Sequence, residues 1–180
     1  MPVIYTDLED RVVLLTGVGQ FPQEYDEEIW GNGAATAKVL AQSGAQIFGC
    51  DIDLASAELT KKRVGEEVKN ARIDVVQTDV TKRAAVVELV KKCMALHGRI
   101  DVLICNVGKS APGGPVEMSD EVSEEVPVDE VPMLNERQVW QSQLDVNLTS
   151  AFLCTGQVLP IMEKQKSGSI ILLSSVAGKG

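Results

Sequence analysis

One stretch near the amino terminus, residues 14–37, constrains the fold more than any other part of the sequence. An apolar run, residues 11–17 (RVVLLTG), overlaps the start of this stretch and predicts a buried strand. A turn containing glycines follows, and small residues from Gly33 onward predict the start of a helix. A parallel strand that enters a helix through glycines brings backbone N–H groups close to a bound anion, which the helix dipole also favours. The stretch therefore predicts a cradle for the pyrophosphate of a dinucleotide.

An acidic residue stands at the distance that such a cradle requires. The next apolar run, residues 46–50 (QIFGC), leads to Asp51, eighteen positions after Gly33. A carboxylate at the end of the second strand can accept hydrogen bonds from the ribose hydroxyls of the dinucleotide. A 2′-phosphate there would meet this negative charge and no nearby arginine, since Lys61 and Lys62 stand ten residues further on. We therefore expect Asp51 to favour NAD over NADP.

Length and charge exclude several classes of protein. The 180 residues suffice for one domain with a sizeable core, and their formal net charge is −9 at pH 7. An acidic protein attracts neither nucleic acid nor an anionic membrane surface. No segment joins a basic start to an apolar core, and no apolar run approaches the length of a membrane span. We therefore expect a cytoplasmic protein that binds neither nucleic acid nor membrane.

The cysteines and the single histidine carry no metal or redox motif. Cys50, Cys93, Cys105 and Cys154 lie in or at the ends of predicted strands and helices, and no two have the close spacing of a metal or dithiol site. They are interpreted as reduced core thiols. His97 falls in the last turn of a predicted helix, where a cation is favourable, which indicates a surface role rather than catalysis. No metal site is predicted.

Beyond Asp51 the chain alternates between amphipathic and short apolar runs. We expect helices at residues 54–69, 81–97 and 139–163, and strands at residues 73–77, 100–105 and 168–174. Thr81 is the predicted N-cap of the second of these helices. Such alternation demands right-handed crossovers and a parallel sheet that is covered on both faces. The sequence thus predicts a doubly wound α/β fold of five strands in the order 3-2-1-4-5, with a cofactor crevice at the carboxyl ends of strands 1 and 4.

Several motifs, in order, resemble those of the short-chain dehydrogenase/reductase family. Thr16-Gly17 and Gly31-x-Gly33 resemble the two halves of its cofactor signature, T-G-x-x-x-G-x-G. Later segments resemble its N-N-A-G motif (residues 105–108, CNVG), the segment of its catalytic asparagine (residues 145–148, DVNL) and the strand end with its catalytic serine (residues 173–178, LSSVAG). The resemblance covers nearly the whole chain and implies a Rossmann-like NAD(P)-binding fold.

The resemblance also implies residue roles. It implies hydride transfer between a nicotinamide and a carbonyl or alcohol carbon of a small molecule, and it implies a homo-oligomer for the full-length family member. The implied catalytic residues are Ser175, which would hydrogen-bond the substrate oxygen, and Asn147, which would support a water relay. The implied cofactor-binding residues are Gly17, Gly31, Gly33, Asp51, Asp79, Val80, Asn106 and Gly108.

The family's proton-transferring tyrosine, with a lysine four residues later, has no match in this sequence. The two tyrosines, Tyr5 and Tyr25, are followed four positions on by Glu9 and Ile29. The family spacing would place the tyrosine beyond Gly180, so the domain of residues 1–180 is expected to be incomplete, ending after the fifth strand. Two hypotheses remain open: an oxidoreductase of the family, or a non-catalytic dinucleotide-binding fragment or mis-spliced product.

Two segments interrupt the family pattern. Thirteen residues, 18–30, stand where the signature has three, and they must loop outward if the glycines are to meet. Residues 122–138 form a second, acidic interruption that is predicted to be a loop. Val122-Ser123 at its start can be encoded by a splice-donor sequence, and Gln138 at its end by a codon that ends as a splice acceptor does. Gly178-Lys179 can likewise be encoded by a donor sequence. The hypothesis of two retained introns stands beside that of a natural insertion and a deliberately shortened chain.

Overall fold

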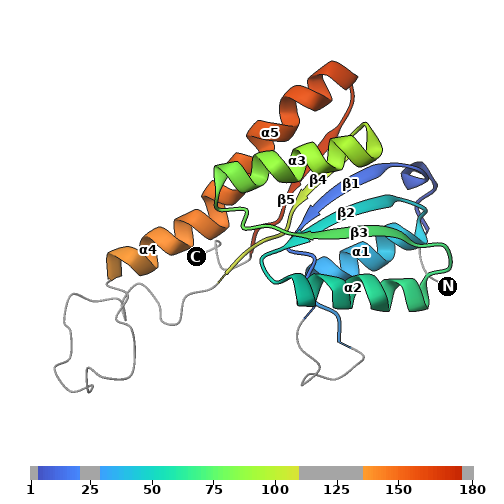
Figure 1. Cartoon of the computed structure of the whole chain (residues 1–180), viewed down its shortest axis with the longest axis horizontal. Coiled ribbons are helices and arrows are strands. Elements are labelled where there is room, and N and C mark those ends of the chain that lie inside the picture. Colours follow the sequence, from blue (N-terminus) through green and yellow to red (C-terminus); the bar gives the residue numbers. More distant parts are fainter. Residues whose placement is uncertain (1–3, 21–28, 110–135, 176–180) are drawn as a thin grey trace.

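The computed structural model describes residues 4–20, 29–109 and 136–175 of the chain. A five-stranded sheet forms its centre, with helices on both faces (Figure 1). The strand order is β3-β2-β1-β4-β5, and each neighbouring pair is parallel. The predicted doubly wound fold and its strand order are confirmed.

The elements lie close to their predicted bounds. The strands are β1 (Val12–Thr16), β2 (Gln46–Asp51), β3 (Arg72–Gln77), β4 (Val102–Cys105) and β5 (Ser169–Leu172). The helices are α1 (Asn32–Gln42), α2 (Leu54–Glu67), α3 (Arg83–His97), α4 (Glu136–Leu144) and α5 (Ser150–Gln165), with a 3-10 turn, η1 (Thr6–Leu8), and a π-helix, η2 (Asp145–Thr149).

The central strand β1 divides the core into two clusters. All five of its residues are buried. Val13 and Leu15 pack with α1 and α2 on one face, whereas Val12 and Leu14 pack with α3 and α5 on the other. Because successive side chains of a strand point to opposite faces, a continuous apolar run such as VVLL can serve both layers. This double cover fixes β1 at the centre, and its carboxyl end lies between those of β2 and β4.

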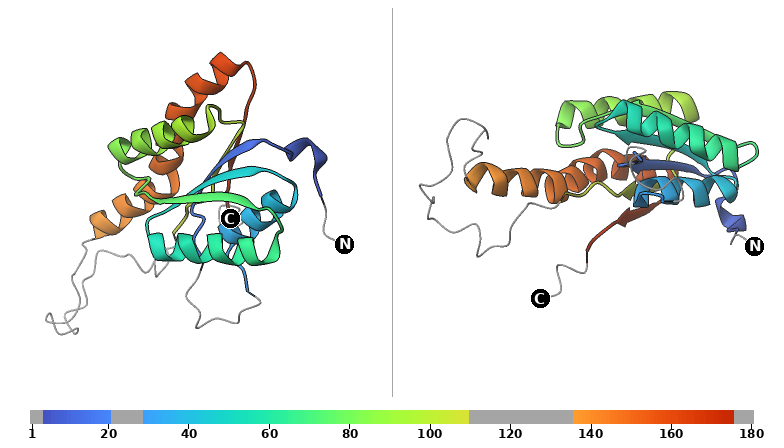
Figure 2. Two further views of the ribbon diagram at one scale, coloured as in Figure 1. Left: turned by 45° about the vertical axis from the view of Figure 1, so that its right-hand side comes forward. Right: turned by 90° about the horizontal axis from the view of Figure 1, so that it is seen from below.

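The last helical segment differs from its prediction. A single helix over residues 139–163 was expected, but α4, η2 and α5 follow one another from Glu136 to Gln165. In Figure 2 they form one long rod that extends past the sheet. Residues 136–138 are helical, so the predicted loop over residues 122–138 was wrong at this end, where the helix-forming sequence ERQ extends α4 backward. Residues 122–135 lie outside the described residues.

The predicted N-cap of α3 was wrong. Thr81 does not cap the helix; Lys82 is the N-cap, and the backbone N–H and hydroxyl of Thr81 donate to Oδ1 of Asp79 at 3.0 and 2.6 Å. The aspartate therefore forms a local turn that competes with capping. His97 ends α3 as predicted, but its ring is partly buried because it packs edge-to-face on Phe48, with centroids 5.9 Å apart.

A buried carboxylate joins β1 to β4 at the amino-terminal edge of the sheet. The Asp101 side chain is 5% exposed; its Oδ2 accepts from the Val12 N–H and from Nε of Arg99, both at 2.9 Å. Nη2 of Arg99 and Nη1 of Arg11 donate to Oδ1 at 2.5 and 3.4 Å. Burial alone would raise the pKa of Asp101, but the hydrogen bonds from Arg99 and Val12 and the two positive charges outweigh it and hold the pKa below its usual value.

The Asp101→Asn variant should be less stable than the wild type at pH 7 by about 1–3 kcal/mol, because an amide cannot accept all of these bonds. A carboxylate with a depressed pKa stabilises the fold above its unfolded pKa, about 3.9, and this contribution is lost as the pH falls through the folded value. The difference in thermal stability between the two proteins should therefore shrink in acid. Asp74→Asn, which alters an exposed ion pair with Lys61, is the control with little effect. An equal difference at pH 7 and about pH 3 would contradict the charge-based explanation.

Candidate functional site

The turn after β1 meets the start of α1 at the level of the backbone. Gly17 has a φ of +69°, in the left-handed region, and its N–H donates to Cys50 O at 2.8 Å. Gly31 is the N-cap of α1, and a Cβ added to Gly33 would overlap the carbonyl oxygen of Gly17. Only glycine permits both the turn and this close approach. Three glycines from both ends of a long interruption thus form one compact turn.

Asn106 joins this turn to the end of β4. Its Nδ2 donates to the carbonyl oxygen of Gly17 at 2.8 Å, and its backbone N–H donates to the Thr16 hydroxyl at 3.2 Å. Because β1 and β4 are parallel neighbours, their carboxyl ends meet at the same edge of the sheet. This edge is where the strand order reverses, and ligands of doubly wound folds bind there.

Asp51 ends β2 beside the same turn. Its Oδ2 accepts from the Gly19 N–H at 2.8 Å, and its Oδ1 accepts from the Asp53 N–H at 3.1 Å. A Cβ on Gly19 would lie 2.6 Å from Oδ2 of Asp51, so the chain passes close against the carboxylate. Sequence analysis did not single out Gly19, although a glycine two positions after Gly17 was a visible signal. The carboxylate is therefore held in one orientation by two backbone donors.

The remaining residues of the site lie along the same edge. Asp79 is in the turn after β3, bonded to Thr81, and the Val80 side chain is buried in the core, so only the backbone of Val80 can reach a ligand. Ser175 is exposed, three positions beyond the last residue of β5. The carboxyl ends of all five strands thus bring these predicted positions to one side of the sheet.

Asn147 lies in η2 and connects the long helical run to the loop after β4. Its Oδ1 accepts from the Lys109 N–H at 2.8 Å, and its Nδ2 donates to Lys109 O at 2.9 Å and to Oε1 of Gln143 at 3.1 Å. A Cβ on Gly108 would lie 3.4 Å from Oδ1 of Asn147. The side-chain amide therefore pairs with the backbone of the loop much as a neighbouring strand would.

The two ends of the predicted insertion, residues 18–30, lie side by side. The Gln20 side chain donates to Ile29 O at 2.8 Å and accepts from the Gly31 N–H at 3.2 Å. Two cations lie over the Trp30 ring: Nζ of Lys38 is 4.6 Å from its centroid, and the guanidinium of Arg63 is 4.1 Å from it. Sequence analysis missed Gln20 and Trp30 because no local pattern shows which side chains meet across a loop. Residues 21–28 lie outside the described residues.

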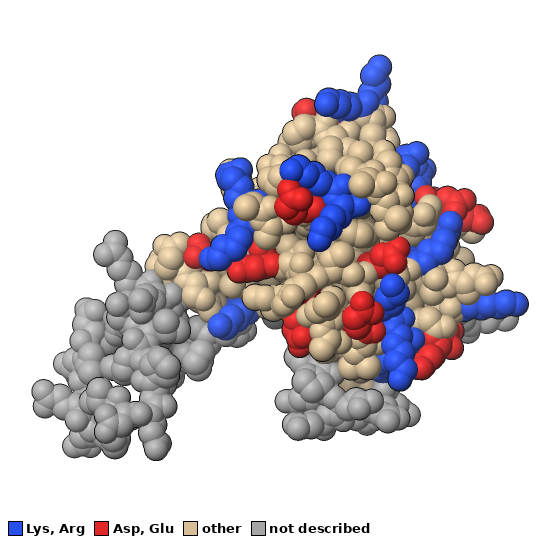
Figure 3. All heavy atoms as spheres, viewed as in Figure 1, with Lys and Arg blue, Asp and Glu red and all other residues tan. Residues whose placement is uncertain are grey.

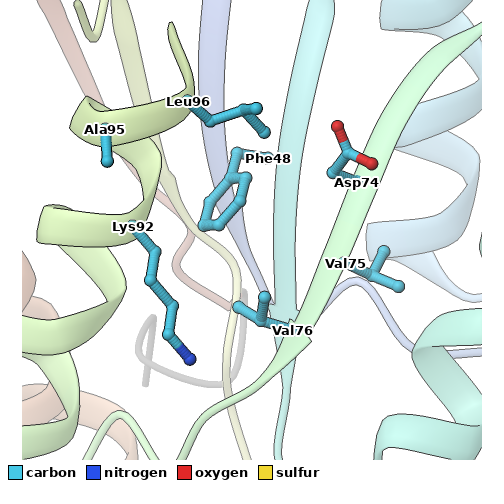
Figure 4. Close-up of a pocket in the computed structure, with 7 residues that line it drawn as sticks. All are labelled: Phe48, Asp74, Val75, Val76, Lys92, Ala95 and Leu96. Atoms are coloured by element: carbon cyan, nitrogen blue, oxygen red, sulfur yellow. The ribbon is translucent and has the colours of Figure 1, made fainter. Parts of the chain in front are cut away.

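Other features of the surface and core lie away from this edge. An open hollow of about 490 Å³ is lined by the middle of β2 and β3 and by α3 (Figure 4), with Phe48, Val76 and Leu96 among its walls. Positive and negative side chains are interspersed over the face seen in Figure 3. In the described part of the chain, no three His, Cys, Asp or Glu side chains converge on a metal position, and no helix is long and apolar enough to cross a membrane.

All four cysteines are buried, as predicted, and unpaired. Burial raises the pKa of the Cys50 and Cys93 thiols to about 12, and the charge of Asp51 adds to this effect at Cys50. These two thiols therefore stay protonated at neutral pH and act as apolar core residues.

Comparison with known proteins identifies the family. The sequence model of the short chain dehydrogenase family matches residues 29–180. The chain belongs to the short-chain dehydrogenase/reductase family. The 3-oxoacyl-[acyl-carrier-protein] reductase FabG of Thermotoga maritima is 32% identical over 171 residues, which are 95% of this chain and 58% of that protein.

Two solved structures share the fold. Levodione reductase superimposes with a TM-score of 0.76 at 30% identity, over 96% of this chain and 57% of that chain. NAD+-bound xylitol dehydrogenase does so with a TM-score of 0.73 at 28% identity, over 96% of this chain and 55% of that one. The chain thus spans less than two thirds of the length of these relatives.

Gly33→Ala should destabilise the protein, because its methyl group would displace the backbone of Gly17. The expected loss in thermal or urea unfolding is about 1–3 kcal/mol. Gly65→Ala is the matched control: Gly65 lies within α2, and an added Cβ meets nothing within 4 Å. That variant should gain about 0.5–1 kcal/mol, since alanine favours the helix. Equal effects of the two substitutions would refute the close approach of the glycine turn to α1.

Proposed function

We propose that these residues form the cofactor-binding part of an NAD(P)-dependent oxidoreductase that transfers hydride between the nicotinamide and a carbonyl or alcohol carbon of a small molecule. The observation that carries the proposal is the contact of Gly33 with the backbone of Gly17, at the carboxyl end of β1. A site with no room for even one Cβ lets a pyrophosphate approach the backbone N–H groups that open α1. Membership of the short-chain dehydrogenase/reductase family supports the same function.

The proposed cofactor contacts follow from the positions of these residues. Gly17, Gly31 and Gly33 shape the pyrophosphate turn, and Asp51 would accept from the adenosine ribose. We assign Asp79 and the backbone of Val80 to the adenine end, and Asn106 and Gly108 to the wall formed by the loop after β4. When bound, the cofactor donates or accepts the hydride at its nicotinamide ring.

We propose that NAD is preferred over NADP. Each oxygen of Asp51 accepts one backbone N–H and keeps a second acceptor position for a ribose hydroxyl. The three basic residues of α2 are engaged elsewhere: Lys61 pairs with Asp74 at 3.3 Å, Lys62 pairs with Glu66 at 3.9 Å, and Arg63 donates to Ile29 O at 3.2 Å. A 2′-phosphate would therefore meet the carboxylate without a dedicated positive partner.

Asp51→Asn should narrow the preference for NADH over NADPH by about tenfold or more, because it removes the repulsive charge and keeps the side-chain shape. Both dissociation constants are measured by nicotinamide fluorescence. Asp53→Asn is the matched control, since Asp53 caps α2 through the Ala55 N–H two residues further along the turn. Tighter binding of NADPH than of NADH by the wild type would overturn the proposed preference.

On the substrate side, we assign Ser175 to the substrate oxygen and Asn147 to a water relay. Two of the three hydrogen bonds of the Asn147 side chain hold Lys109, in the loop after β4, against η2, and the third goes to Gln143 of α4. The side chain thus uses both of its N–H donors and one acceptor position, which leaves the second lone pair of Oδ1 for a relay water.

For residues 1–180 taken alone, the second candidate function is dinucleotide binding without turnover, because neither tyrosine is followed by a lysine four positions on. The backbone N–H of Tyr5 bonds to the Ser43 hydroxyl, after the end of α1, so Tyr5 lies at the amino-terminal edge of the sheet, opposite the site. Tyr25 lies outside the described residues. A phenol also needs a nearby cation to act as a base at neutral pH.

We further propose that the whole protein is a homo-oligomer that uses the long helical run. Leu148 and Phe152 are 64% and 67% exposed on this run, and Trp140 is exposed one turn before η2. Large apolar side chains gathered on one element are typical of a surface that is covered in an assembly.

The 180-residue chain should bind NADH saturably but show no turnover with NAD and secondary alcohols, or with NADH and the matching ketones. Binding is followed by nicotinamide fluorescence and turnover by absorbance, while light scattering reports the size of the protein. Turnover at ordinary enzymatic rates, about 1–1000 per second, would show that another group transfers the proton. Absence of NADH binding would overturn the proposed cofactor site itself.

A further inference from the structure

The turn at Gly17 is joined to α1 by more residues than are needed to bridge the distance between them. Ten residues lie between Gln20 and Gly31, yet the Gln20 side chain touches both Ile29 and Gly31. A long loop between the two halves of a ligand cradle leaves their relative position uncertain, because each extra residue adds conformations that binding must exclude. A contact that closes the loop at its base removes this cost in advance.

Gln20 supplies such a contact from a buried position. Only 5% of the Gln20 surface is exposed. Its side-chain amide makes two hydrogen bonds: Nε2 donates to Ile29 O at 2.8 Å, and Oε1 accepts from the Gly31 N–H at 3.2 Å. Its backbone is fixed as well, since Gln20 O accepts from the Ser56 hydroxyl at 2.6 Å and Gln20 N–H donates to Ser56 O at 3.3 Å. The amide therefore connects α2 to the N-cap of α1.

The second arm of the loop is anchored by different residues. Nη1 of Arg63 donates to Ile29 O at 3.2 Å, so this carbonyl accepts from both Arg63 and Gln20. The Trp30 ring contacts the cations of both Lys38 on α1 and Arg63 on α2. The base of the loop is thus tied to both helices that cover this face, and Gln20 is the link between its two arms.

We propose that Gln20 is a positioning residue for the pyrophosphate cradle: its side-chain amide closes the base of the inserted loop and so holds Gly31 and the first turn of α1 in register with Gly17. This inference rests on the proposed dinucleotide binding. Gln20 itself need not touch the cofactor. The Gly31 N–H is taken by the amide, and the N–H groups of Asn32 and Gly33 open the helix toward the ligand.

The test compares ligands with and without a pyrophosphate. Gln20→Met keeps the length and volume of the side chain but removes both hydrogen bonds. It should weaken the binding of ADP-ribose about tenfold and leave the binding of adenosine unchanged, since adenosine does not use the cradle. Calorimetry measures the first ligand and ligand-observed NMR the second.

Gln165→Met is the matched control. The Gln165 amide makes the same kind of paired contact, accepting from the Ile100 N–H at 3.1 Å and donating to Ile100 O at 2.8 Å, at the opposite edge of the sheet. This variant should lose comparable thermal stability and bind both ligands as the wild type does. Equal weakening of ADP-ribose and adenosine by Gln20→Met, or no weakening, would overturn the inference.

A rescue experiment separates positioning from folding. Replacing residues 21–28 by a short glycine-serine link closes the loop covalently, so that Gln20→Met should have no effect on ADP-ribose binding in this background. A persistent loss there would also overturn the inference, and this comparison holds even if the single variant folds poorly. Failure of the wild type to bind ADP-ribose would instead refute the proposed function.

Discussion

The close approach of the Gly33 backbone to the carbonyl of Gly17 is the constraint on which the rest of the site depends. It requires the end of β1 and the start of α1 to lie close together in space, and therefore requires α1 to pack directly against the sheet. Asn106 binds the same carbonyl from β4, so the two central strands end at one level. The positions of the other proposed cofactor contacts depend on this point, because β2 and β4 pair with β1 in a defined register.

The carboxyl edge of the sheet is polar and tightly bonded, whereas its faces are apolar. Backbone N–H groups orient Asp51, and the amide of Asn147 holds the backbone of Lys109. Such contacts fix the proposed ligand-binding groups before a ligand arrives, which lowers the entropy cost of binding. The two apolar clusters below this edge supply the rigidity, since packed strands and helices move less than loops.

The sequence was sufficient for the sheet and its order, because continuous apolar strands alternating with amphipathic helices admit few topologies. Asp51 was placed correctly at the end of β2, since a carboxylate after an apolar run marks the edge of a sheet. The bonds of Gln20 and Trp30 could not be predicted, because they join residues through the tertiary fold. Asp79 and Thr81 both have side chains that can cap a helix, and they stand two positions apart. Only the structure shows that Thr81 instead donates to the carboxylate of Asp79.

The hydrogen bonds of the Gln20 side chain to Ile29 and Gly31 also bear on how the sequence of such a protein can evolve. A loop whose arms are held together at the base transmits little strain to the strands beneath, so its length and composition are free to drift. An interruption inside a nucleotide signature would otherwise be expected to destroy it. The same property makes positions 21–28 a suitable graft point for a reporter peptide, since the junctions at Gln20 and Ile29 are already closed by hydrogen bonds.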